Sequence, residues 1–194
     1  MISGVFGLCG SGKSCFLAYC AERVLKGKSV SVGGYTLSKK HSAVYSNFGL
    51  KGCYKLSFSD LGSKDIRDAL ILLDEASLDA DSRNFKNFSF QSKYFFSHHR
   101  HFHTSVIWCS QSYDDTDRRI RNLTDNFFHV RRLTGSFSEV VPIVPFCGVQ
   151  RGAIVTEYQE SLFFQHKLLY LPRYYKTFDS FCTKPLAKHV PELW

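Results

Sequence analysis

Near its amino end the chain contains the glycine-rich sequence Gly7-Leu8-Cys9-Gly10-Ser11-Gly12-Lys13-Ser14. It matches the pattern G-x-x-x-x-G-K-[ST] at every fixed position. Glycines permit backbone angles that turn successive N–H groups inward, which makes a concave site for an anion. The motif therefore predicts a loop that cradles phosphate groups. The residues expected to form the cradle are Gly7, Gly10, Ser11, Gly12, Lys13, Ser14 and Cys15.

The sequence on either side of this loop supplies the context that the motif requires. Met1–Phe6 is an apolar run typical of a strand, and Lys13–Lys26 carries apolar residues at the spacing of a helix, followed by Gly27. A helix that begins at the loop adds unpaired amides and the positive end of its dipole, so a chance match is disfavoured. We therefore expect Lys13 to contact the β- and γ-phosphates of ATP and the Ser14 hydroxyl to ligate Mg²⁺.

Two acidic residues that follow a second apolar run are candidate partners of the loop. Ala69–Leu73 is typical of a strand buried on both faces of a parallel sheet, and Asp74 and Glu75 follow it directly. Asp74 is expected to hold the metal, through water or Ser14. Glu75 is expected to point to the other face of the strand end and to activate the attacking water, as in hydrolytic motors. The alternative for Glu75 is a solvated residue without a catalytic role.

Strand and helix patterns alternate along the rest of the chain, which indicates an α/β sheet with right-handed crossovers. We predict a three-layer P-loop NTPase sandwich around a mainly parallel central sheet, with residues 1–135 as the ATPase core. Residues 136–194 are expected to form a β-rich extension packed on that core, within a single domain. Helices are expected at Phe85–His99 and Asp114–Asn122. Strands are expected at Ser29–Val32, Ala43–Ser46, Tyr54–Phe58, Ser105–Cys109, Phe127–Arg131, Val140–Phe146 and Ala153–Tyr158.

Composition and charge exclude several classes of protein. The 194 residues are 44% hydrophobic and 22% charged, which is close to the globular average and excludes disordered and collagen-like chains. The 25 Lys and Arg exceed the 17 Asp and Glu, which leaves a net charge of +8. No run reaches the roughly 18 apolar residues of a spanning helix, so we expect no transmembrane segment. Seven cysteines at irregular spacings favour reduced thiols and a cytoplasmic location.

Positive charge is concentrated between Arg83 and Arg132, where nine Lys and Arg accompany four Asp and Glu and five of the eight histidines. Aromatic residues are interleaved with these charges, which suits contact with a phosphate backbone and stacking on bases. For any single residue the alternative is solvated surface charge above core aromatics. The histidines of His98–His103 have no carboxylate or cysteine at ligand spacing, so we do not expect them to bind a metal.

Two further positions are candidates for catalysis. Gln111 follows an apolar strand pattern, where motor ATPases place a residue that senses the γ-phosphate; a polar strand end is the alternative. Arg118 and Arg121 lie three residues apart on a short predicted helix, beside Arg119. An arginine presented to the nucleotide of a neighbouring subunit stabilises charge in the transition state. The same arginines could instead pair with the preceding aspartates on the surface, where they would contribute little.

In this order the motifs resemble the zonula occludens toxin (Zot)-like family, which includes the assembly ATPases of filamentous phages and is related to the FtsK/HerA DNA-pumping ATPases. The resemblance covers roughly residues 1–132. Its most specific part is Arg100-His101, the strand end at Gln111, and Ile120-Arg121 in series. The stretches that carry it are Gly7–Ser14, Leu72–Ala76, Phe95–His101, Ile107–Ser112 and Asp117–Leu123.

The resemblance implies an additional-strand P-loop ATPase that uses ATP and Mg²⁺ and works as a homo-oligomeric ring or membrane-associated assembly. It implies a motor for DNA packaging or virion export in phage morphogenesis, with the phage or viral genome as partner. It supports Gln111 as the sensor and Arg121 as a trans-acting or structural arginine, with Arg100 as a second candidate.

Filamentous-phage members of that family continue into a transmembrane helix and a periplasmic domain, and this sequence shows the pattern of neither. We therefore expect a motor in the host cytoplasm, with a separate membrane or coat-protein partner and peripheral contact with the inner face of the membrane as options. Two other functions stay open. One is a small-molecule or nucleoside kinase, which transfers phosphate to an acceptor rather than to water. The other is a nucleotide-dependent DNA-binding scaffold without turnover.

Overall fold

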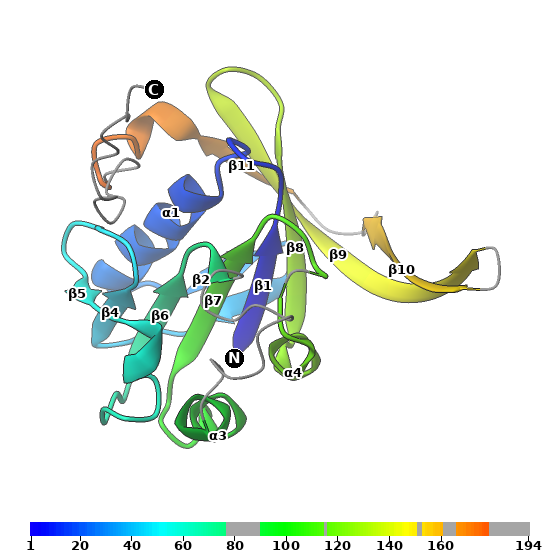
Figure 1. The fold of residues 1–194 in the computed structure, drawn as a ribbon. Helices are drawn as coiled ribbons and strands as arrows, with labels where there is room; N and C mark the ends of the chain where they lie inside the picture. Colours follow the sequence, from blue (N-terminus) through cyan, green and yellow to red (C-terminus); the bar gives the residue numbers. More distant parts are fainter. Residues whose placement is uncertain (77–89, 115, 151–152, 161–165, 179–194) are drawn as a thin grey trace, which may run out of the picture.

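The computed structural model describes residues 1–76, 90–114, 116–150, 153–160 and 166–178. In this part a nine-stranded sheet has the order β10-β9-β8-β1-β7-β6-β4-β5, with β11 paired to β9 (Figure 1). Its strands are β1 (Ile2–Phe6), β4 (Ala43–Ser46), β5 (Tyr54–Lys55), β6 (Ala69–Leu73), β7 (Ser105–Ser110), β8 (Asn126–Arg132), β9 (Phe137–Gln150), β10 (Ala153–Glu160) and β11 (Lys167–Tyr170). A separate hairpin joins β2 (Val30–Val32) and β3 (Tyr35–Ser38).

The strands from β8 to β5 are parallel, whereas β9, β10 and β11 are joined by antiparallel pairing. Strand β1 lies between β7 and β8, and β7 lies between β1 and β6. The register places Phe6 opposite Ser110 and Leu73 opposite Trp108. Because parallel strands end at the same edge, the residues that follow β1, β7 and β6 meet at one edge of the sheet.

Helices cover both faces of the sheet, because successive residues of each buried strand point to opposite faces. On β6, Leu70 and Leu72 pack into one hydrophobic cluster with α1 (Lys13–Leu25). Ile71 and Leu73 pack into a second cluster, with side chains of α3 (Phe90–His98) and α4 (Arg118–Leu123). The predicted three-layer α/β sandwich with a mainly parallel sheet is therefore confirmed.

Several elements differ in extent from the prediction. The predicted strand Tyr54–Phe58 is shorter because Ser57 and Asp60 form a capping box that starts a 3₁₀ turn, η1 (Phe58–Asp60). The helix predicted from Asp114 begins at Arg118, because the Asp117 carboxylate accepts the Arg119 N–H at 2.7 Å and caps it there. The first five residues of the predicted helix at 85–99 lie outside the described residues. None of the helices in the described segments combines the length and apolarity needed to cross a membrane.

The segment after β8 enlarges the sheet. Strand β9 pairs antiparallel with β8, and it begins at Phe137, three residues earlier than predicted. The strands predicted at Val140–Phe146 and Ala153–Tyr158 are present as the antiparallel pair β9 and β10, which projects away from the body of the molecule (Figure 1). Strand β11 and the short 3₁₀ turn η2 (Leu171–Arg173) then bring the chain back beside α1. The return of the chain was not predicted from the sequence.

One glycine in the central strand is required by packing. Gly4 stands on β1 opposite Trp108 and Phe127, and a Cβ atom there would lie 2.6 Å from Trp108 Cζ2 and 2.9 Å from Phe127 Cδ1. The Trp108 ring is fully buried, and its Nε1 donates to Thr124 Oγ1 at 3.1 Å. The ring is thus fixed from two sides and cannot give way cheaply.

We expect Gly4→Ala to lower the free energy of unfolding by about 1–3 kcal/mol, because it overpacks this layer of the core. Urea denaturation measures the loss. Gly49→Ala is the matched control, since a Cβ there meets no atom within 4 Å, and it should change stability by less than about 0.5 kcal/mol. Equal stability of the two variants would contradict this packing of Trp108 on Gly4.

Candidate nucleotide-binding site

The loop between β1 and α1 has the shape that its glycines permit. Gly10 and Gly12 have φ of 74° and 104°, in the region that other residues rarely adopt. The Ser11 N–H donates to Leu8 O at 3.1 Å and closes the turn. A Cβ on Gly12 would lie 2.8 Å from Leu171 Cδ2, and one on Gly7 would lie 2.3 Å from the Val130 carbonyl oxygen. The loop can therefore sit this close to its surroundings only with glycine at these positions.

The amino end of α1 faces the space enclosed by the loop. The Phe16 N–H donates to the Gly12 carbonyl at 2.9 Å and is the first amide of the helix with such a partner. The amides of Lys13, Ser14 and Cys15 precede it and have no acceptor one turn back. Unpaired N–H groups together with the helix dipole favour an anion at this position.

Lys13 supplies the positive charge of the site. Its side chain is buried, at 5% exposure, and Nζ donates to the carbonyl oxygens of Gly7 at 2.8 Å and Leu8 at 3.2 Å. These two bonds hold the ammonium group against the loop. Because an ammonium group has three N–H donors, one remains for a phosphate oxygen.

Ser14 and Asp74 join the loop to the neighbouring acidic strand end. Ser14 Oγ donates to Asp74 Oδ2 at 2.5 Å, across 60 positions of sequence. Asn47, just after β4, holds the backbone of Asp74 in place: its Nδ2 donates to Asp74 O at 2.9 Å, and its Oδ1 accepts the Asp74 N–H at 2.8 Å. Sequence reasoning missed Asn47; its position as a polar residue directly after an apolar strand is the signal that could have found it.

The sequence pattern predicted that Glu75 points to the opposite face of the strand end from Asp74. In the structure it does not. Strand β6 ends at Leu73, and Glu75 has a left-handed backbone with φ of 48°. Its N–H donates to Asp74 Oδ1 at 3.1 Å. As a result Asp74 and Glu75 both line the cavity in front of the loop. The two carboxylates thus share one space.

The cavity has a volume of about 490 Å³. Of the predicted phosphate-binding residues, Gly10, Gly12, Lys13, Ser14 and Cys15 line it. Gly7 and Ser11 instead support the loop from behind. Ser11 is buried, and its carbonyl oxygen accepts a hydrogen bond from Ser138 Oγ at 2.5 Å. Burial raises the pKa of the Cys15 thiol to about 11, so this group brings no negative charge to the site at pH 7.

Aromatic side chains from two distant segments form the far wall of the cavity. They are Phe48, Tyr175 and Phe178, and the Phe48 and Phe178 ring centroids are 6.1 Å apart. The carboxy-terminal part of this wall is tied to the core, because the Lys51 N–H donates to Thr177 O at 3.0 Å. No sequence pattern indicated that residues after Tyr170 reach the loop; their aromatic content is the only signal.

Arg132 adds a second cation at the rim of the cavity. Its Nη1 donates to Gly10 O at 2.9 Å, and its Nε donates to Thr134 O at 3.2 Å. The guanidinium group is therefore held beside the phosphate loop. Sequence reasoning noted Arg132 only as the end of the basic segment. Arg132 is the last residue of β8, and β8 lies next to β1 in the sheet, which accounts for its position here.

The remaining sequence candidates lie outside this cavity. Gln111 follows the end of β7, between the strands that lead to the loop and to Asp74, and its side chain is exposed. Arg121 pairs with Asp114 at 2.9 Å and lies over the Tyr113 ring, 4.3 Å from its centroid. This is a pairing with a preceding aspartate, as the sequence left open, but the Arg121 side chain is mostly buried. Arg100 is mostly exposed and pairs with Asp125 at 3.0 Å. Arg118 and Arg119 are exposed. A contact between any of these residues and a nucleotide stays a prediction.

The donors present suit Mg²⁺. The Ser14 hydroxyl and the Asp74 carboxylate offer oxygen ligands side by side, and Mg²⁺ binds one or two protein oxygens together with phosphate oxygens and water. The described residues include no group of three or more His, Cys, Asp or Glu that could hold a metal ion. This pair of oxygens facing the loop is thus the arrangement expected for a metal that arrives with a nucleotide.

Comparison with known proteins supports the fold. No protein-family model matches the sequence, and no curated protein matches it. Among solved structures, the N-terminal domain of zonular occludens toxin from Neisseria meningitidis matches with a TM-score of 0.58 and 15% identity, over 92% of this chain and 98% of that chain.

The genome packaging NTPase B204 from Sulfolobus turreted icosahedral virus 2, solved with ATP-gammaS and with AMPPCP, matches with a TM-score of 0.46 and 14% identity, over 80% of this chain and 95% of that chain. At 15% identity, the likeness to the zonular occludens toxin domain speaks for the fold alone. The chain has the α/β fold of P-loop NTPases, and the Zot domain that the sequence resembles is a structural neighbour.

Proposed function

We propose that this chain is a Mg²⁺-dependent ATP-hydrolysing motor that acts on DNA in phage or virus morphogenesis. The observation that carries the proposal is the hydrogen bond between Ser14 and Asp74, which sets a phosphate-binding loop and an acidic strand end in one cavity with Lys13 and Glu75. The virion role, packaging or export, follows the Zot-like resemblance of the sequence. A scaffold without turnover would not need the second carboxylate in the cavity.

The residues that line the cavity have different roles in the proposed hydrolysis of ATP. The amides at the start of α1 and the Lys13 ammonium bind the phosphates and stabilise the charge that develops on the oxygens of the γ-phosphate. Ser14 and Asp74 would hold Mg²⁺, which when bound neutralises charge on the phosphate oxygens. The Glu75 carboxylate accepts a proton from the water whose oxygen attacks the γ-phosphorus, and the bond to the oxygen of ADP breaks. Phosphate and ADP are the products.

The arginines outside the cavity enter this proposal through a second copy of the chain. Arg121 is the favoured trans-acting arginine, with Arg100, Arg118 and Arg119 as other candidates, and Gln111 is the sensor of the γ-phosphate. A homo-oligomer that forms on ATP binding would bring one of the arginines to a neighbour's nucleotide. Phosphate release to water, stimulated by single- or double-stranded DNA, supports the motor. Phosphate found on an acceptor instead supports a kinase, and ATP binding without turnover supports a scaffold.

Glu75→Gln should retain ATP binding and lower the rate of phosphate release by about 10²–10⁴-fold, because the amide cannot accept the proton from water. Phosphate release under single-turnover conditions measures the rate, and calorimetry with ATP and Mg²⁺ measures binding. Asp65→Asn is the matched control, since it makes the same chemical change on an exposed carboxylate outside the cavity, and it should hydrolyse ATP normally. Unchanged turnover in the Glu75→Gln protein would remove Glu75 from the mechanism.

The aromatic wall is expected to stack on the base of the nucleotide. Tyr175 is half exposed within the cavity, so its ring is available to a ligand. Tyr175→Ala should weaken ATP binding by roughly tenfold, as base–aromatic stacking of about 1–3 kcal/mol requires, and leave the affinity for inorganic tripolyphosphate unchanged. Calorimetric titration with each ligand distinguishes the two effects.

Tyr170→Ala controls for the loss of a tyrosine nearby, because Tyr170 has almost the same exposure, 51% against 50%, and does not line the cavity. It should bind ATP normally. Equal losses of ATP and tripolyphosphate affinity in the Tyr175→Ala protein would show that the aromatic wall stabilises the phosphate loop and does not stack on the base.

A further inference from the structure

A second cavity, of about 800 Å³, opens at the edge of the sheet opposite the phosphate loop. Met1, Asp68 and Ser105 line it, and each stands at the start of a parallel strand, β1, β6 or β7. The phosphate loop, in contrast, follows the end of β1. The two cavities share no lining residue. The second cavity is therefore a separate site, and the nucleotide chemistry described above does not use it.

Basic side chains predominate in its lining. Four of them are Lys39, Lys40, Arg67 and Arg100, whereas two acidic residues, Asp68 and Asp125, line it. Asp125 is engaged within the fold: its Oδ2 accepts the Ile2 N–H at 2.8 Å, and its Oδ1 accepts from Arg100 at 3.0 Å. It therefore offsets part of the positive charge while remaining bound to the protein.

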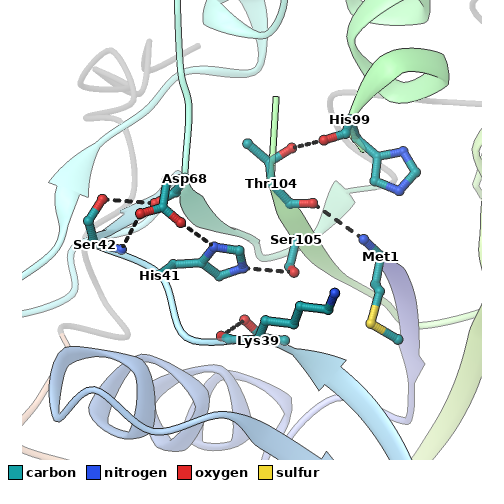
Figure 2. A network of polar contacts seen from close by, with 9 residues as sticks. Met1, Lys39, His41, Ser42, Asp68, His99, Thr104 and Ser105 are labelled. Atoms are coloured by element: carbon teal, nitrogen blue, oxygen red, sulfur yellow. Dashed lines mark hydrogen bonds and ion pairs between the residues drawn. The ribbon is translucent and has the colours of Figure 1, made fainter. Parts of the chain in front are cut away.

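The second acid, Asp68, belongs to a network around His41 (Figure 2). Asp68 Oδ1 lies 3.2 Å from His41 Nδ1, and Oδ2 accepts the Ser42 N–H at 3.2 Å. On its other side, His41 Nε2 lies 2.9 Å from Ser105 Oγ. Burial lowers the pKa of the His41 ring, so the ring is neutral at pH 7 and adds no charge. The network ties the segment before β4 to the starts of β6 and β7.

Lys39 and Lys40 are the cations that this network leaves available. They directly precede His41, and both are exposed. Neither has an ion-pair partner within the described ranges. In Figure 2 the Lys39 side chain extends from the anchored segment toward Met1. Since the backbone that carries the two lysines is already fixed, an anion that binds them has to order only their side chains.

The backbone at this cavity is strained. Asp68 and His103 have φ of 45° and 53°, which costs of order 1 kcal/mol or more for each non-glycine residue. Glu75 is the third non-glycine residue with positive φ in the described part of the chain. Glu75 lines the nucleotide cavity, and the other two line this one. Strain of this kind persists where the surrounding structure holds a functional geometry.

We propose that this second cavity binds the phosphate backbone of a nucleic acid, with Lys39 and Lys40 as the residues that contact phosphates. The cations stand on three separate segments around an open cavity, and this distribution suits an extended polyanion better than a single small anion. Next to Arg100, α3 presents the half-exposed Tyr94, stacked on His98 with ring centroids 4.1 Å apart, as a surface for bases. The proposal rests on the proposed function only for the choice of nucleic acid as the ligand.

Salt-dependent binding of nucleic acid tests the site. The probes are fluorescein-labelled single-stranded and duplex DNA of equal length, titrated with the full chain between 50 and 200 mM salt. The variant is Lys39→Gln/Lys40→Gln. The control, Lys28→Gln/Lys55→Gln, removes the same charge from two exposed lysines outside both cavities.

Loss of two phosphate contacts should make the slope of log K against log salt shallower by about 1.4 for single strands or 1.8 for duplex. It should also lower the affinity at 50 mM salt by more than about tenfold. The control should keep the wild-type slope, and both proteins should bind ATP as the wild type does.

The outcomes separate this site from the proposed function. A wild-type slope in the Lys39→Gln/Lys40→Gln protein overturns the site, even if ATP hydrolysis is normal. A shallower slope in a protein that hydrolyses no ATP supports the site and contradicts the motor. Failure of the wild-type chain to bind either DNA overturns the site. Saturable displacement of DNA by millimolar inorganic phosphate at constant ionic strength assigns the cavity to a small anion and also overturns the proposal.

Discussion

The hydrogen bond between Ser14 and Asp74 is the contact on which the site depends. It links a helix start to a strand end that are distant in sequence, and it exists because β7 lies between β1 and β6 while all three strands run in the same direction. Parallel pairing places their ends at one edge, and Asn47 then fixes the backbone of Asp74. Without this strand order the two motifs would be separate pieces of sequence with no common chemistry.

The parallel strands of the sheet have a different cavity at each of their two ends. At the edge where the parallel strands end, loop amides, Lys13 and the carboxylates face a cavity closed by aromatic rings. At the edge where they begin, a basic cavity surrounds the His41 network. The proposed motor would have to couple a change at the nucleotide to a change at the nucleic acid, and strands β1, β6 and β7 run directly from one cavity to the other. The fully buried residues of these strands make that connection stiff.

Local patterns in the sequence were sufficient for the fold and for the centre of the site. The loop motif requires a strand before and a helix after it, and the apolar run at Ala69–Leu73 is typical of a strand buried inside a parallel sheet. Local patterns could not predict the features that depend on contacts between distant parts of the chain or on tertiary packing. The aromatic wall depends on the return of the chain through β11, and the position of Glu75 depends on one left-handed residue. Neither leaves a periodic signal, because each is decided by tertiary packing.

A crystal structure of the chain with Mg²⁺ and a non-hydrolysable ATP analogue would show whether the nucleotide binds at this loop. Triphosphate oxygens should lie on the amides of Lys13, Ser14 and Cys15, with the metal about 2.1 Å from Ser14 Oγ and on the side of the cavity that Asp74 lines. A nucleotide bound elsewhere on the chain, or a metal that contacts neither Ser14 nor a water held by Asp74, would contradict this assignment of the site.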